Sequence, residues 1–168
     1  MVAIMKKTLI HTSLLLLSIS SSAFAHDLEY PTEPTFKMTP KGNLLVGKDD
    51  LALYTFKKDV NSPIPPKCTS MKDKGPLGSC LARWPAAIVT IKEMKNLILQ
   101  DPKFGAVYNN ELNKLQLTYS GLPTYYWFKD TEKNNFTGDG VGNAWSLILK
   151  DMPPTMFNGV TANTTESN

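Results

Sequence analysis

The chain has 168 residues, in which 18 lysines and arginines face 15 aspartates and glutamates. The formal net charge of +3 is small and the lysines are scattered among acids and amides, so we expect no nucleic-acid partner. This length suits one domain with a sizeable core, and twelve prolines and ten glycines indicate many turns.

The amino terminus has the pattern of a cleavable secretory signal. Lys6 and Lys7 precede an apolar stretch over residues 9–19, and Ala23-Phe-Ala25 follows as an Ala-x-Ala cleavage site. The apolar part is too short to span a membrane as a helix. We therefore predict a signal peptide over residues 1–25 and a protein that is periplasmic or secreted, with no membrane anchor.

Three short strands are predicted after the signal. Residues 26–34 hold two prolines and are expected to form an extended N-terminal arm. Apolar stretches over residues 35–38, 43–47 and 51–56 then alternate with turn residues, which is the pattern of an antiparallel meander. We place this first unit at about residues 35–90.

Cys68 and Cys80 are the two cysteines of the chain, and both lie in its exported part. An even number of cysteines in an oxidising compartment favours a disulfide bond, which would close the polar loop between them. A redox-active pair or a metal–thiolate site is less favoured, because the spacing differs from Cys-x-x-Cys and the sequence has no third cysteine.

One short helix is predicted to link two β units. Residues 91–100 contain neither Gly nor Pro, and Asp101-Pro102 is expected to end the helix. The apolar side chains of this segment share one helical face, and they are Ile91, Met94, Leu97 and Ile98.

A second unit, at about residues 104–150, repeats the strand order of the first. Apolar stretches over residues 104–108, 114–119 and 122–128 are separated by Asn, Ser and Gly residues at the positions where hairpins turn. The composition then becomes polar, so residues 152–168 are predicted to form a flexible tail.

An internal repeat supports this organisation. The pattern Tyr-x-aromatic-x-x-Asp occurs within residues 51–59 and within residues 122–130, and the two stretches agree at Leu, Tyr, Lys and Asp without a gap. Each copy is followed by a loop and a segment led by a tryptophan, Trp84 or Trp145. We therefore predict a mainly β fold, in which two pseudo-repeated antiparallel β-meander units form one domain over residues 35–151.

These features together resemble a bacterial secreted-repeat family, whose members are described as predicted lipoproteins with a conserved Tyr-x-aromatic-x-x-Asp motif and no established function. Besides the two motif copies, the resemblance is carried by residues 80–85, 119–125 and 138–142 with Trp145 after them, so that it covers about residues 44–149. It implies an exported protein and names no reaction. The chain lacks the lipid-attachment cysteine of the lipoprotein members.

The aromatic and acidic residues of the motif have two interpretations. Side chains alternate along a strand, so the two aromatics of each copy share a face and are expected in the core, with the Asp accepting backbone N–H groups in the following turn. Alternatively, two related half-sites would stack a sugar ring or another flat ligand between their aromatic rings. The candidate binding residues are then Tyr54, Phe56, Asp59, Tyr125, Trp127 and Asp130.

Catalytic and metal sites are harder to build from this composition. After signal removal His26 is the one remaining histidine and both cysteines are expected in a disulfide, so no catalytic residue is assigned. Cleavage before His26 would place an α-amine and an imidazole on one residue, which suits Cu²⁺, and the thioethers of Met152 and Met156 suit Cu⁺.

The sequence therefore favours an exported, non-catalytic binding module of the envelope or the extracellular space. Its partner would be a small ligand, a glycan or another protein, and no cofactor is expected. The alternative is a periplasmic copper-binding protein that uses His26. An enzyme that uses a carboxylate pair such as Asp59 and Asp130 is the third hypothesis.

Overall fold

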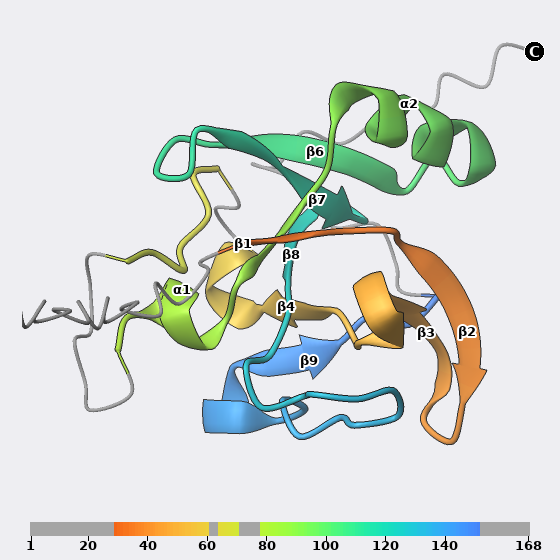
Figure 1. Cartoon of the computed structure of the whole chain (residues 1–168), viewed down its shortest axis with the longest axis vertical. Coiled ribbons are helices and arrows are strands. Elements are labelled where there is room, and N and C mark those ends of the chain that lie inside the picture. The colour runs from red at the N-terminus through yellow and green to blue at the C-terminus, as the bar shows by residue number, and fades with distance from the viewer. Residues whose placement is uncertain (1–28, 61–63, 71–77, 152–168) are drawn as a thin grey trace, which may run out of the picture.

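The protein contains two β-sheets, and its structure is a computed structural model that describes residues 29–60, 64–70 and 78–151 (Figure 1). The larger, mainly antiparallel sheet has seven strands, and a second sheet has two. The mainly β class is therefore confirmed. None of the helices among the described residues is long and apolar enough to cross a membrane. The elements are β1 Glu29–Pro31, β2 Thr35–Thr39, β3 Gly42–Val46, β4 Tyr54–Phe56, β5 Ala86–Ile88, β6 Phe104–Asn109, β7 Lys114–Tyr119, β8 Leu122–Tyr125, β9 Trp145–Leu147, helices α1 Cys80–Arg83 and α2 Ile91–Gln100, and 3-10 turns at Lys48–Asp50, Lys57–Asp59 and Val141–Asn143.

The start of the described chain adds a strand to the large sheet. Within the segment predicted as an extended arm, β1 pairs in parallel with β5. Thr32 N then donates a hydrogen bond to Ile88 O at 3.0 Å, so this part of the arm is held by main-chain hydrogen bonds. The signal peptide predicted over residues 1–25 and the tail predicted over residues 152–168 lie outside the described residues.

The strands β4 and β8, which carry the two motif tyrosines, lie side by side in the large sheet. The strand order is β1-β5-β7-β8-β4-β9, with β6 beside β7 and a further pairing between β5 and β8. Apart from β1 with β5, the strand pairs of the described residues are antiparallel. The topology therefore brings the two motifs together.

The second unit forms its predicted meander, whereas the first unit is divided between the two sheets. β6, β7 and β8 pair in sequence order, and their last turn has positive φ at Ser120 and Gly121, 49° and 79°, as a two-residue hairpin requires. In the first unit, β2 and β3 form the small sheet and meet the segment before β4 through a bridge between Val46 and Ala52. β4 pairs instead with β8 and β9 of the second unit.

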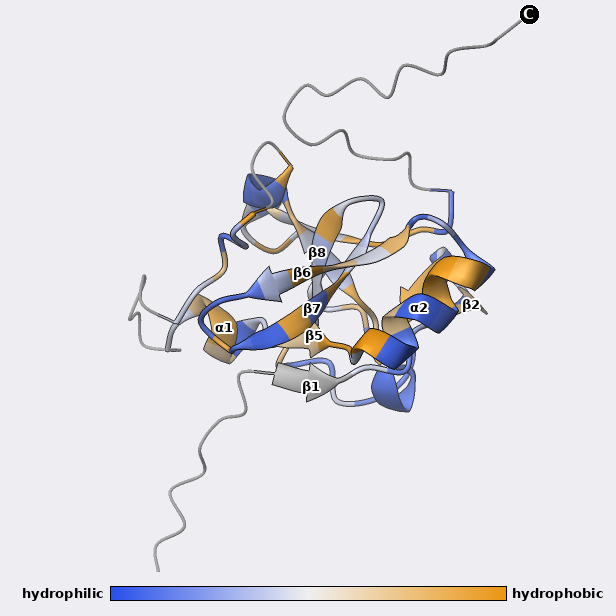
Figure 2. Ribbon diagram, turned by 90° about the horizontal axis from the view of Figure 1, so that it is seen from above, coloured by the Kyte–Doolittle hydropathy of each residue, from blue (hydrophilic) through white to orange (hydrophobic). Residues whose placement is uncertain are grey.

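The helix α2 has the predicted bounds and begins with a capping box. Thr90 Oγ1 accepts from Glu93 N at 3.2 Å, and the Glu93 carboxylate accepts from Thr90 N at 2.7 Å. Leu97 is buried in the core, but Ile91 and Ile98 are exposed, so the predicted apolar face is covered in part. The reason is that α2 lies at the periphery beside β6 and meets the sheet along one side (Figure 2).

The apolar side chains form two clusters, and alternation along the strands separates them. Leu53 and Tyr126 belong to the first cluster, while their neighbours Tyr54, Tyr125 and Trp127 belong to the second. Because both faces of the sheet are covered, β4 and β8 are buried at every position. The first cluster comprises Leu45, Leu53, Ala87, Val89, Leu97, Phe104, Leu117, Tyr119, Tyr126 and Ile148, and the second comprises Ala52, Tyr54, Phe56, Cys68, Leu81, Trp84, Ala86, Tyr125, Trp127 and Trp145.

The last four residues of β7 are also buried, on both faces of the sheet, although the alternating sequence of this strand predicts a half-buried strand. Leu117 belongs to the first cluster as expected, yet Gln116 beside it is fully buried as well. The Gln116 amide accepts from Asn109 Nδ2 and donates to Thr124 O, both at 2.9 Å. These hydrogen bonds offset the cost of removing the polar side chain from water.

Candidate functional site

The tyrosines of the two motifs lie opposite each other. Tyr54 of β4 pairs with Tyr125 of β8, and the two strands are antiparallel. Both side chains are fully buried and belong to the second cluster. In this arrangement each tyrosine hydroxyl reaches the aspartate of the other motif.

The first of these contacts joins Tyr54 to Asp130. Tyr54 donates its hydroxyl proton to the Asp130 carboxylate, with 2.5 Å between the two oxygens. The buried Asp130 also accepts from the backbone N–H and the hydroxyl of Thr137, at 3.0 and 2.6 Å. Asp130 therefore connects β4 with the loop of residues 131–137 that follows its own motif.

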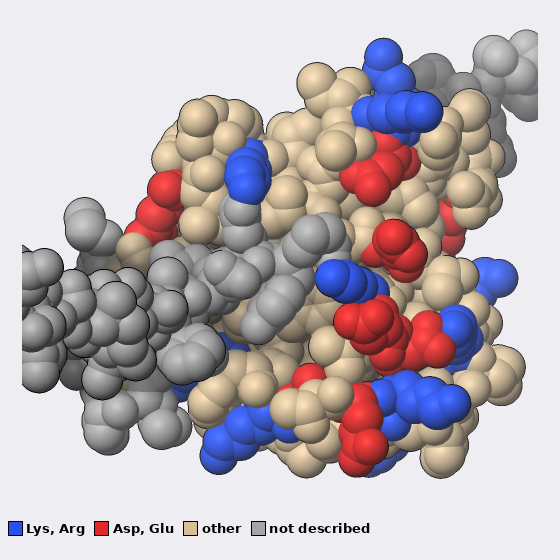
Figure 3. All heavy atoms as spheres, viewed as in Figure 1, with Lys and Arg blue, Asp and Glu red and all other residues tan. Residues whose placement is uncertain are grey.

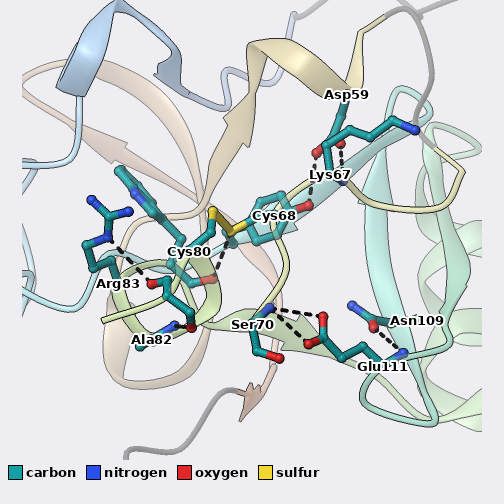
Figure 4. Close-up of a disulfide and its surroundings, with 12 residues drawn as sticks. Asp59, Lys67, Cys68, Ser70, Cys80, Ala82, Arg83, Asn109 and Glu111 are labelled. Carbon is teal, nitrogen blue, oxygen red and sulfur yellow. Dashed lines mark hydrogen bonds between the residues drawn. A yellow bond between two sulfur atoms is a disulfide. The ribbon is translucent and has the colours of Figure 1, made fainter. Parts of the chain in front are cut away.

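The second contact has the same form. Tyr125 donates its hydroxyl proton to Asp59 at 2.9 Å. Asp59 is fully buried and also accepts from Lys67 N at 2.7 Å, across the loop that follows the first motif (Figure 4). Each aspartate thus binds the tyrosine of the other copy and holds the loop after its own.

Burial changes the acid–base properties of these groups. Removal from water raises the pKa of Asp59 to about 6, although hydrogen bonds from Lys67 and Tyr125 act in the opposite direction. Burial, followed by the hydrogen bond to Asp130, raises the pKa of Tyr54 above its ordinary value. The pKa of Tyr125 is raised by burial and then by the charge of Asp59. Both phenols therefore stay protonated at neutral pH and remain hydrogen-bond donors.

Four aromatic rings make a continuous series of contacts beside the tyrosine pair. Trp84 and Trp145 are at its centre, with 3.7 Å between ring centroids and 6° between ring planes. Phe56 stacks on Trp145 at 4.3 Å, and Trp127 lies against Trp84 at 4.1 Å. We call this series, in the order Phe56, Trp145, Trp84 and Trp127, the aromatic stack.

The two motif tyrosines meet the aromatic stack edge-on. The Tyr54 ring lies 5.5 Å from Trp84 at an angle of 75°, and the Tyr125 ring lies 5.2 Å from Trp145 at 90°. Edge-to-face contacts at such distances are favourable because the positive edge of one ring meets the negative face of the other. Each tyrosine therefore joins an inner tryptophan to a buried carboxylate.

The disulfide predicted between Cys68 and Cys80 is confirmed. It joins the loop after the first motif to α1, and Cys68 Sγ lies 4.0 Å from Trp84 O at the edge of the aromatic stack (Figure 4). The same loop is fastened to the second unit, because Ser70 N donates to both carboxylate oxygens of Glu111 at 2.9 and 3.1 Å.

The structure brings the six candidate binding residues together, and it places them in the core. Their exposed fractions lie between 0% and 8%, which favours the interpretation that the motif joins strands and loops. Trp84 and Trp145 lead the segments that follow the two motif copies, but they are not among the site residues predicted from the sequence. Their equivalent places after the two loops are the signal that could have identified them. The six residues are Tyr54, Phe56, Asp59, Tyr125, Trp127 and Asp130.

The copper hypothesis concerns residues that the structure does not describe. His26, Met152 and Met156 lie outside the described residues, so metal binding by them stays a prediction. Within the described part of the chain, no group of three or more His, Cys, Asp or Glu side chains is placed to hold a metal ion.

The loop closed by Asp130 borders a small surface hollow. The hollow measures about 170 Å³ and lies between this loop and the β2–β3 hairpin, with Lys37, Asp50, Lys133 and Phe136 among its lining residues. Lys37 and Asp50 form an ion pair. Two larger hollows, of about 420 and 450 Å³, lie beside the two ends of α2. On the face shown in Figure 3, positive and negative side chains are interspersed.

Comparison with known proteins finds a family match for part of the chain. Residues 107–148 match the Lipoprotein_15 family, a secreted repeat of unknown function. The resemblance is therefore confirmed over these residues, which are fewer than the predicted 44–149, and the first motif copy lies outside the match. The description of the family as secreted agrees with the export predicted from the sequence. No curated protein and no solved structure matches the chain.

Proposed function

We propose that the protein is an exported, non-catalytic binding module, in which a buried Tyr–Asp pair fixes the shape of the loop that contacts the ligand. The observation that carries this proposal is the closure of residues 131–137 by two hydrogen bonds from Thr137 to Asp130, which Tyr54 in turn holds from β4. A loop that is already ordered loses less conformational freedom on binding, so less of the interaction energy is lost.

The lining of the adjacent hollow indicates the kind of ligand. Lys37 and Lys133 place two amines there against one carboxylate, Asp50, which leaves a net positive charge. Phe136 supplies an aromatic surface, and Asn134 supplies an amide that can donate and accept hydrogen bonds. The volume of about 170 Å³ is below that of pockets for drug-sized molecules, so it suits one ring-sized group. An acidic sugar residue within a longer saccharide has these properties.

Titration with galacturonic acid oligomers, with neutral galactose oligomers for comparison, tests this proposal. The acidic oligomers are expected to shift the backbone amide NMR signals of residues 131–137 and of the β2–β3 hairpin, while the neutral oligomers leave them unchanged. Lys133→Glu should abolish the shifts, and Lys95→Glu on the exposed side of α2 is the matched control that should retain them. Unshifted signals with the acidic oligomers, or full binding by Lys133→Glu, would contradict the proposal.

A further inference from the structure

The tryptophans of the aromatic stack and the two motif tyrosines form a connected path of side chains that lose an electron readily. Trp84 and Trp145 are in direct ring contact, and each also contacts one motif tyrosine edge-on, Tyr54 or Tyr125. Electron transfer between groups in van der Waals contact is fast because their orbitals overlap. An electron vacancy created on either tryptophan therefore has a short route to a tyrosine.

A buried tyrosine gives up an electron easily where a base can take its hydroxyl proton, because the phenol becomes a strong acid once it is oxidised. Tyr54 and Tyr125 each have such a base, since their hydroxyl oxygens lie 2.5 and 2.9 Å from the carboxylates of Asp130 and Asp59. These distances are within the reach required for direct proton transfer. Both acceptors are buried, so the transferred proton is kept from water.

We propose that the aromatic stack and the two Tyr–Asp pairs form a site that gives one electron to strong one-electron oxidants such as oxyl radicals. The oxidant takes one electron from a tryptophan of the stack. Tyr54 or Tyr125 then returns an electron to that tryptophan and passes its hydroxyl proton to the bound aspartate. The net change is one electron gained by the oxidant, one neutral tyrosyl radical and one protonated carboxyl group.

The acid–base properties of Tyr125 and Asp59 agree with a transfer of the proton from the tyrosine to the aspartate. The pKa of Asp59, raised by burial to about 6, allows this carboxylate to hold a proton close to neutral pH. The raised pKa of Tyr125 keeps its phenol intact until an electron is removed. The proton is therefore expected to move together with the electron, and not before it.

Two other buried tyrosines provide matched controls within the same chain. Tyr119 also donates to a carboxylate, Asp101, at 3.1 Å, but it belongs to the first cluster, across the sheet from the tryptophans. Tyr126 belongs to the first cluster too, and its hydroxyl lies 3.0 Å from Lys48 N. Both tyrosines belong to the first cluster and the tryptophans belong to the second, so neither tyrosine should lose an electron quickly to an oxidised tryptophan.

Pulse radiolysis of the full chain, with its disulfide intact, provides the test. Azide radicals oxidise tryptophan, and the absorption of the tryptophanyl radical should then be replaced by that of a tyrosyl radical at a rate independent of protein concentration. The transfer should slow in deuterated water because a proton moves with the electron. Tyr119→Phe and Tyr126→Phe should leave the rate unchanged.

The variants that remove the pairs decide the outcome. Tyr54→Phe/Tyr125→Phe should lose the rapid tyrosyl signal, and Asp59→Asn/Asp130→Asn should slow it by about tenfold or more, the factor that corresponds to about 1.4 kcal/mol in barrier height. Near-ultraviolet circular dichroism reports whether each double variant is folded. If a double variant does not fold, the two single variants replace it. Each single variant is expected to lower the tyrosyl yield by about half if the two routes carry equal shares. Unchanged tyrosyl formation in the tyrosine variants, or a tryptophanyl radical that decays solely by collision, would overturn the proposal.

Discussion

The burial of Asp59 predicts an unusual dependence of stability on pH. Its pKa is about 6 in the folded protein against an ordinary value of 3.8, so the folded state binds the proton more tightly than the unfolded chain. The stabilisation that this provides is fully present below the unfolded pKa and is lost as the pH rises through about 6. The difference of about two pKa units corresponds to about 3 kcal/mol in the free energy of unfolding.

The substitution that isolates this effect is Asp59→Asn, which keeps the shape of the side chain and one acceptor oxygen but does not titrate. Urea unfolding at closely spaced pH values between 4 and 7 should show that the wild type loses stability relative to the variant as the pH rises, by about 2 kcal/mol over this range, because the rest of the difference lies below pH 4. Comparing the two proteins removes the contribution of other carboxylates. If the stability difference between wild type and Asp59→Asn is the same at every pH, the reasoning is refuted.

Two further predictions concern the packing around the motifs. Trp84→Ala removes a central ring of the aromatic stack and should lower the free energy of unfolding by about 3–5 kcal/mol in urea titrations, whereas Phe128→Ala, at a half-buried position, should cost less. A smaller loss for Trp84→Ala than for Phe128→Ala would contradict this. Reduction of the disulfide between Cys68 and Cys80, which are 12 positions apart, should lower the free energy of unfolding by about 2–4 kcal/mol. Equal urea unfolding midpoints with and without reductant would contradict this prediction.

Local patterns in the sequence predicted much of the architecture. The hairpin turn at Ser120 and Gly121, the helix α2 and the disulfide all depend on residue types within a short stretch of chain, and all are present. The apolar face of α2 was harder to predict, because the exposure of Ile91 and Ile98 depends on where the helix meets the sheet. The division of the first unit between two sheets is likewise decided by contacts with the second unit.

The hydrogen bonds between the candidate residues could not be predicted from the sequence. The motif spacing identified Tyr54 and Asp59 as related to Tyr125 and Asp130, but bonds within each copy and bonds between the copies fit the same sequence equally well. The choice between them depends on the antiparallel pairing of β4 with β8, which joins positions far apart in the chain. A single sequence carries no local sign of that pairing.

The central claim is that the tyrosine of each motif forms a hydrogen bond to the aspartate of the other motif. Double-mutant cycles measure these interactions most directly. Tyr→Phe and Asp→Ala substitutions are combined in urea unfolding experiments for each of the four possible pairs. The pairs Tyr54 with Asp130 and Tyr125 with Asp59 should each show a coupling free energy of about 1.5–3 kcal/mol, as expected for hydrogen bonds to a charged group. The pairs Tyr54 with Asp59 and Tyr125 with Asp130 should be additive within about 0.5 kcal/mol. Coupling within each motif, with additivity between the motifs, would contradict the account.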